Sequence, residues 1–169
     1  MKNIYFVGMP GSGKSTLGRH IAEKLYRDFL DTDEEIAQQV GLTPEQIITL
    51  QGEEKFRKME KNLLEKLLNM SGLVVSTGGG FPVFNENMKY LNDHGITVYL
   101  RYNVKTLWSR LHNDRIRPLS SSAESTAELL ASRESIYRKA QIIIDGESNL
   151  DQNILLTLNA IRDRYPEEI

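Results

Sequence analysis

A glycine-rich segment near the start of the chain constrains the fold more than any other feature. It runs from Gly8 to Thr16 with the sequence GMPGSGKST, directly after the apolar run Ile4–Val7. This is the spacing G-x-x-x-x-G-K-[ST], in which glycines let successive backbone N–H groups point at phosphate oxygens in front of a helix N-terminus. Apolar residues then recur at helical spacing, namely Leu17, Ile21 and Leu25. We therefore predict a strand, a phosphate-binding loop and a helix, with a nucleotide triphosphate bound at the loop.

Two side chains of this loop have predicted chemical roles. Lys14 would reach the β- and γ-phosphates, and the hydroxyl of Ser15 would bind Mg²⁺. The predicted cofactor-binding residues of the loop are Gly11, Ser12, Gly13, Lys14, Ser15 and Thr16. The alternative, a glycine-rich turn that binds nothing, is disfavoured because a strand precedes the motif and a helix follows it.

Length and composition limit the class of protein. A length of 169 residues suits a single domain with a sizeable core, so we expect one domain over residues 1–169. Basic and acidic residues are interspersed and the net charge is -2, so no basic face is expected to bind nucleic acid. There is no cysteine, and the three histidines lack the spacing of a metal site. No charged leader or long apolar segment is visible, so we expect a soluble cytoplasmic protein without a membrane partner.

Short apolar runs alternate with longer amphipathic stretches along the chain, the pattern of βα units that build a parallel sheet covered on both faces. The predicted strands lie near residues 3–7, 28–31, 73–76, 96–101 and 141–145. The predicted helices lie near residues 14–26, 33–40, 44–51, 53–70, 85–93, 104–111, 125–139 and 150–164.

Two segments interrupt this rhythm. Residues 32–70 hold several helices between two strands, more than a crossover needs, and we expect a substrate-binding segment over about 32–62. Residues from about 112 to 125 are polar and rich in serine, and we expect them to form a mobile lid.

Two carboxylates lie at the end of the predicted strand 28–31, at the edge where ligands of open parallel sheets bind. Alternate residues of a strand project to the same side, so Asp31 and Asp33 could face one site. We expect Asp31 near a metal ion and Asp33 on a substrate hydroxyl. A role as a helix N-cap would account for Asp33 alone but would leave Asp31 unexplained.

Further candidate residues lie near the helix starts and the lid. Arg57 stands beside the apolar face of its helix, where it could also be a solvated charge paired with Glu53. The run Gly78–Gly80 favours a close approach of the backbone to a ligand over a plain loop. An arginine on a closing loop commonly stabilises a transferred phosphoryl group, and four arginines bracket the lid. They are Arg110, Arg115, Arg117 and Arg133, of which Arg115 is the first candidate for a merely solvated charge.

In these motifs the chain closely resembles the shikimate kinase family, which is part of the nucleoside monophosphate kinase-like group of phosphate-loop enzymes. The resemblance covers nearly the whole length. It rests on G-x-x-G-x-G-K-S-T-x-G in 8–18, D-T-D in 31–33, G-E-x-x-F-R-x-x-E in 52–60, G-G-G in 78–80, R-P-L in 117–119 and R-x-x-x-Y-x-x-A in 133–140. It implies an α/β fold of three layers, with a five-stranded parallel sheet of order 2-3-1-4-5, a helical substrate-binding insertion and a lid. The implied activity is the ATP-dependent phosphorylation of the 3-hydroxyl of shikimate, a step of aromatic amino acid biosynthesis.

The resemblance also implies roles for matching residues on the acceptor side. The residues that would bind shikimate are Asp33, Arg57, Gly79, Gly80 and Arg133. Arg57 and Arg133 would bind the carboxylate, and Glu60 would orient Arg57. Asp33 would orient the 3-hydroxyl or act as a general base, and these two roles stay open. Ile48 stands where the family commonly has an aromatic residue.

On the donor side, the family resemblance implies ATP as phosphoryl donor and Mg²⁺ as metal ion. Lys14 and Arg117 would neutralise the γ-phosphoryl group during transfer, and Arg110 would cover the adenine. Ser15 would bind Mg²⁺ directly and Asp31 through water. The implied catalytic residues are thus Lys14, Asp33 and Arg117.

Two other classes of function stay open at this point. Another small-molecule kinase, such as a gluconate or nucleotide kinase, would need a different acceptor pocket. A non-catalytic nucleotide-binding module would have no reason to keep Asp33, Arg57, Gly79 and Arg117 together. For the kinase, we expect a monomer whose partner is a small-molecule substrate and not a nucleic acid.

Overall fold

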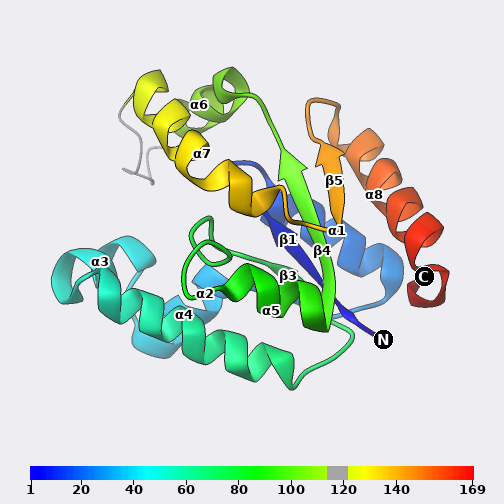
Figure 1. Ribbon diagram of the computed structural model, residues 1–169, viewed down its shortest axis with the longest axis horizontal. Coiled ribbons are helices and arrows are strands. Elements are labelled where there is room, and N and C mark those ends of the chain that lie inside the picture. Colours follow the sequence, from blue (N-terminus) through cyan, green and yellow to red (C-terminus); the bar gives the residue numbers. More distant parts are fainter. Residues whose placement is uncertain (114–121) are drawn as a thin grey trace.

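The computed structural model describes residues 1–113 and 122–169 of the chain. In this part, five parallel strands form one sheet in the order β2-β3-β1-β4-β5 (Figure 1). The strands are β1 (Asn3–Val7), β2 (Phe29–Asp31), β3 (Val74–Ser76), β4 (Gly95–Arg101) and β5 (Ile142–Asp145). The strand order implied by the family resemblance is therefore confirmed.

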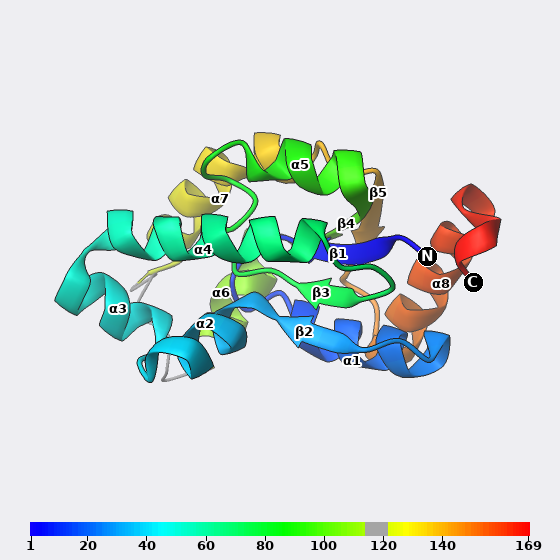
Figure 2. The same cartoon turned by 90° about the horizontal axis from the view of Figure 1, so that it is seen from below.

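Helices cover both faces of the sheet and make three layers. Figure 2 shows α4 and α5 on one side of the strands and α1 and α8 on the other. The α-helices are α1 (Lys14–Leu25), α2 (Thr32–Val40), α3 (Pro44–Gln51), α4 (Glu53–Leu68), α5 (Asn87–His94), α6 (Val104–Asn113), α7 (Ala123–Tyr137) and α8 (Leu150–Arg164). A short 3-10 helix, η1 (Pro166–Glu168), follows α8. Each α-helix and strand begins and ends within two residues of its predicted position, and η1 was not predicted.

The core lies on both faces of the central strands. Every residue of β1 is buried, and in β4 only Arg101 at the end is partly exposed. A parallel sheet between two helical layers requires strands that are apolar on both faces, which explains the mainly apolar runs in the sequence. The buried strands hold their carboxyl ends in fixed positions, and the loops that follow them build the site.

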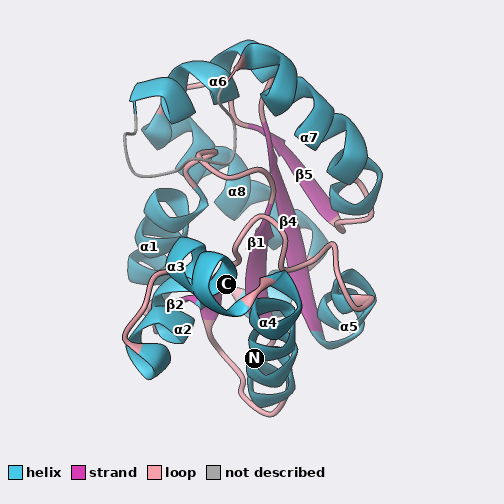
Figure 3. Ribbon diagram, turned by 90° about the vertical axis from the view of Figure 1, so that its left-hand side faces the viewer, coloured by secondary structure: helices cyan, strands magenta, loops and turns pink. Residues whose placement is uncertain are grey.

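Helical segments flank the carboxyl ends of the strands. Figure 3 places α6 and α7 at the top of the view and α2, α3 and α4 at the bottom. The lid predicted over about 112–125 falls mostly on residues 114–121, which lie outside the described residues. Its margins lie within α6 and α7.

Among the helices of the described part, none is long and apolar enough to span a membrane.

Candidate active site

The phosphate-binding loop connects β1 to α1 at the carboxyl edge of the sheet. Gly11 and Gly13 have φ angles of 75° and 84°, a left-handed conformation that glycine adopts without strain. The N–H of Ser12 donates to the carbonyl of Met9 at 3.3 Å, which closes the turn. Within the described residues, no side chain caps the N-terminus of α1. Its first N–H groups therefore suit an anionic ligand such as a phosphate.

Lys14 and Ser15 begin α1 and carry the polar groups nearest the loop. The buried Lys14 folds back over the loop, where its Nζ donates to the carbonyl of Met9 at 2.7 Å. Ser15 Oγ donates to Asp31 Oδ2 at 2.5 Å and lies 3.0 Å from Ser76 Oγ. The structure thus brings together the two residues predicted to bind the metal ion.

A hydroxyl and a carboxylate beside a phosphate site fit Mg²⁺, which usually keeps several waters and takes one or two carboxylates plus phosphate oxygens. No group of three or more His, Cys, Asp or Glu side chains that could hold a metal occurs in the described part of the chain. A cation held by Ser15 and Asp31 would therefore depend on the nucleotide for further ligands.

The two aspartates after β2 are arranged differently from the prediction. The strand ends at Asp31, and Asp33 lies in the first turn of α2, so strand alternation does not relate them. Asp31 is the helix N-cap, because its Oδ1 accepts from the N–H of Asp33 at 3.0 Å and of Glu34 at 3.3 Å. Assigning the possible N-cap role to Asp33 was therefore wrong, since the helix begins earlier than predicted. Asp31 combines capping with its bond to Ser15, and Asp33 lines a cavity.

This cavity has a volume of about 220 Å³ and lies next to the phosphate-binding loop, from which Pro10 contributes to its wall. The residues predicted to bind the acceptor all line it, namely Asp33, Arg57, Gly79, Gly80 and Arg133. The helix α3 lies in the predicted substrate-binding segment and contributes Pro44, Glu45, Ile48 and Thr49. Two further carboxylates, Glu53 and Glu60 of α4, complete the charged part of the lining.

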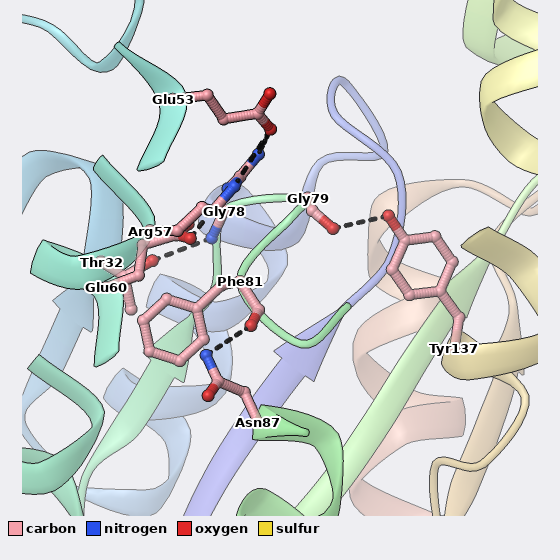
Figure 4. Close-up of polar contacts among 9 residues, drawn as sticks. All are labelled: Thr32, Glu53, Arg57, Glu60, Gly78, Gly79, Phe81, Asn87 and Tyr137. Atoms are coloured by element: carbon pink, nitrogen blue, oxygen red, sulfur yellow. Dashed lines mark hydrogen bonds and ion pairs between the residues drawn. The ribbon is translucent and has the colours of Figure 1, made fainter. Parts of the chain in front are cut away.

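Two of these carboxylates hold Arg57. Its Nη1 donates to Glu60 Oε2 at 2.8 Å, and its Nη2 and Nε donate to Glu53 Oε1 at 3.0 and 3.3 Å (Figure 4). The guanidinium carbon lies 4.0 Å from the ring centroid of Phe84, which packs against it. Arg57 therefore forms the helical pair with Glu53 that the spacing allowed, and it lines the cavity as well.

Glu60 is almost completely buried beside Arg57, with 1% of its side chain exposed. Burial raises the pKa of Glu60 to about 7, although the charge and hydrogen bond of Arg57 oppose the rise. A carboxyl group with a raised pKa inside a cavity is typical of functional sites. The contact with Glu60 gives Arg57 the orienting partner that the family resemblance implied.

The three glycines after β3 make room for the charged side chains. A Cβ on Gly80 would lie 2.5 Å from Arg57 Nη1, and one on Gly79 would lie 2.7 Å from Pro10 Cδ and 3.2 Å from Arg133 Nη1. A Cβ on Gly78 would collide with the carboxylate of Asp33. None of the three glycines has a positive φ angle. Space beside Pro10 and the charged side chains, and not an unusual backbone conformation, therefore requires glycine here.

Three buried side chains from three helices fix this glycine loop, and sequence reasoning missed their roles (Figure 4). Thr32 Oγ1 accepts from the N–H of Gly78 at 2.8 Å. Tyr137 donates its hydroxyl to the carbonyl of Gly79 at 2.7 Å, and burial raises the pKa of Tyr137 to about 12. Asn87 Nδ2 donates to the carbonyl of Phe81, also at 2.8 Å. Thr32 lies in the D-T-D motif and Tyr137 in the R-x-x-x-Y motif, which were the only sequence features that pointed to these two residues. No sequence feature pointed to Asn87.

A second cavity, of about 310 Å³, adjoins the other side of the phosphate-binding loop. Arg110 lies at its wall, with its guanidinium carbon 4.2 Å from the ring centroid of Tyr102 and its Nη1 donating to the carbonyl of Ser12 at 3.2 Å. The predicted contact of Arg110 with adenine agrees with this position but is not tested by it. Arg115 and Arg117 lie outside the described residues.

Comparisons with known proteins identify the family of the chain. The shikimate kinase family model matches residues 10–161. The shikimate kinase of Sulfurihydrogenibium sp. (strain YO3AOP1) is 40% identical over 156 residues, covering 92% of this chain and 94% of that protein. The solved structure of shikimate kinase from Acinetobacter baumannii in complex with shikimate has a TM-score of 0.91 and 35% identity, over 98% of this chain and 95% of that one.

A gluconokinase from Sinorhizobium meliloti 1021 has a TM-score of 0.66 at 16% identity, covering 98% of this chain and 94% of that one. At this low identity, the likeness shows a shared fold and nothing about the acceptor. The family match and the relatives above 30% identity extend over nearly the whole chain. The chain belongs to the shikimate kinase family.

Proposed function

We propose that this chain transfers the γ-phosphoryl group of ATP to the 3-hydroxyl of shikimate, giving shikimate 3-phosphate and ADP in aromatic amino acid biosynthesis. The family assignment makes the chain a kinase that acts on shikimate. The observation that carries the finer proposal is one cavity beside the phosphate-binding loop, lined by Arg57, Arg133 and Asp33. A hydroxylated ring acid needs fixed cations for its carboxylate and an acceptor for the reacting hydroxyl. The shikimate complex of the Acinetobacter baumannii relative supports the same acceptor here.

On the acceptor side, Arg57 and Arg133 bind the shikimate carboxylate, because planar guanidinium groups match a carboxylate with two parallel hydrogen bonds. Asp33 accepts a hydrogen bond from the 3-hydroxyl and directs it at the γ-phosphorus. A loose transition state needs little proton removal beforehand, so orientation is the first role that we assign to Asp33.

Backbone groups of Gly79 and Gly80 contact the ring hydroxyls in this proposal. The carbonyl of Gly79 already accepts from Tyr137, and the carbonyl of Gly80 accepts from the N–H groups of Val83 and Phe84. The backbone N–H groups of the two glycines are therefore the better candidates for contacts with the substrate.

On the donor side, the phosphate-binding loop holds the phosphates of ATP and Lys14 neutralises the γ-phosphoryl group. Ser15 and Asp31 would hold Mg²⁺, which supplies charge neutralisation across the phosphates. Arg110 covers the adenine in the second cavity. The role of Arg117 in stabilising the transferred group rests on the family resemblance. Catalysis then comes mainly from positioning and charge stabilisation.

A coupled assay of ADP release with shikimate, quinate, gluconate and AMP as rival acceptors tests this function. We expect turnover with shikimate and at most weak turnover with the other three. Faster turnover with gluconate or AMP would favour another small-molecule kinase. The monomeric state and the cytoplasmic location stay predictions, which light scattering after size exclusion and cell fractionation can check.

A further inference from the structure

The acceptor cavity is more acidic than its proposed ligand suggests. Among the described residues that line it, the acidic ones are Asp33, Glu45, Glu53 and Glu60, and the basic ones are Arg57 and Arg133. Even with Glu60 protonated, three acidic side chains face two arginines. Shikimate is itself an anion. It therefore has to compete with carboxylates of the protein for the same cations.

The competition is most direct at Arg57, because its hydrogen-bonding edges already have partners. One oxygen of Glu53 accepts from both Nε and Nη2, at 3.3 and 3.0 Å, and so covers one whole edge of the guanidinium. This edge presents two parallel N–H groups, the geometry that a ligand carboxylate uses for a bidentate contact. Glu60 Oε2 accepts a hydrogen bond from Nη1 at 2.8 Å.

The two glutamates differ in how easily they can leave Arg57. The side chain of Glu60 is 1% exposed and would need another partner inside the protein. The side chain of Glu53 is 56% exposed and sits at the first residue of α4, so it can turn into water. Glu60 and the ring of Phe84 would still hold Arg57 in place after Glu53 left.

We propose that Glu53 is a built-in competitor of the substrate carboxylate. It covers the Nε–Nη2 edge of Arg57 and is displaced when shikimate binds. This inference rests on the proposed function, because it requires an acceptor with a carboxylate. Glu53 thereby lowers the affinity for shikimate and contributes to specificity, since only an acceptor that binds this edge well enough can replace it. An exposed ion pair of this kind changes affinity by about two- to fivefold.

The substitution Glu53→Gln tests the proposal, with Glu54→Gln as the matched control. Glu54 is the next residue of α4, is exposed, and is absent from the cavity lining. Its substitution therefore removes an equal charge from the same helix start without changing the cavity. The dissociation constant for shikimate, measured by titration calorimetry, should fall by about two- to fivefold in Glu53→Gln. It should change less than about 1.5-fold in Glu54→Gln, and the gain should shrink at high salt.

Three outcomes overturn the proposal. A weaker affinity in Glu53→Gln would mean that Glu53 positions Arg57 for the substrate. An equal gain in both variants would indicate general charge repulsion, and an unchanged affinity would mean that shikimate binds beside Glu53. In an Arg57→Ala background, the gain from Glu53→Gln should disappear, because the contested edge is gone. Failure of the proposed function looks different, since the wild-type protein would then neither bind nor phosphorylate shikimate.

Discussion

Substituting Gly80 by alanine should weaken shikimate binding through Arg57. The added Cβ would lie 2.5 Å from Nη1, 2.7 Å from Nη2 and 2.8 Å from Cζ of Arg57. Carbon contacts are unstrained only beyond about 3.5 Å, so the guanidinium would have to withdraw by roughly 0.7–1 Å. A charge-assisted hydrogen bond of about 2.8 Å from Arg57 to the shikimate carboxylate would then lengthen beyond hydrogen-bonding distance.

The size of the effect follows from the lost contact. A hydrogen bond to a charged group contributes roughly 1.5–3 kcal/mol, which corresponds to an increase of about ten- to a hundredfold in the dissociation constant for shikimate. The KM for ATP should change little, because the clash lies in the acceptor cavity. Stability should fall by about 1–3 kcal/mol, since the displaced Nη1 is the hydrogen-bond partner of the buried Glu60.

Calorimetric titration of four proteins checks this reasoning as a double-mutant cycle. They are the wild type, Gly80→Ala, Arg57→Ala and the double variant. Once Arg57 is gone, the alanine at position 80 has nothing to displace and should cost no further affinity. If the two losses add instead, the alanine obstructs the ring itself, and the explanation through Arg57 is refuted.

Three further predictions concern groups around the loops. Lys14→Met should lower turnover by about a hundredfold or more, with an unchanged circular dichroism spectrum, because the ammonium charge beside the phosphate-binding loop is lost. Glu60 has its pKa raised to about 7 in the folded protein, so the wild type should lose stability relative to Glu60→Gln as the pH rises from about 4.5 to 7. The loss, measured by urea unfolding at pH 5 and 8, should reach up to roughly 3 kcal/mol, and parallel pH profiles would contradict it. Tyr137→Phe removes the donor to the carbonyl of Gly79, so it should destabilise the fold by about 1–3 kcal/mol and raise the KM for shikimate but not for ATP.

The fold could be predicted closely because its signals are local. The helix α3 begins with a capping box between Thr43 and Gln46 and has Pro44 at its first position, all readable within four residues. The central strands are buried on both faces, so they appear as mainly apolar runs. The start of α2 was harder to place, because Asp31 and Asp33 are both good capping residues and only the end of β2 decides between them.

The sequence was enough to predict which residues gather at the site, but not how they contact one another. Parallel strands bring their carboxyl ends to one edge, so candidates after β1, β2 and β3 were expected to meet there. The three glycines were interpreted as a backbone approach to a ligand, whereas the structure also shows that they leave space for Pro10 and for the charged side chains of Asp33, Arg133 and Arg57. Such packing joins residues as many as 69 positions apart, as between Pro10 and Gly79, and no local pattern records it.

The polar groups of the site have partners inside the protein before any ligand arrives. Lys14 donates to the carbonyl of Met9, and Ser15 donates to Asp31. A buried polar group without a partner costs free energy, so the folded protein supplies internal partners, and a ligand has to replace them. Ligand affinity is then the difference between two sets of contacts. Removing an internal partner that the ligand displaces, such as Glu53, should strengthen binding, and removing one that stays, such as Glu60, should weaken it.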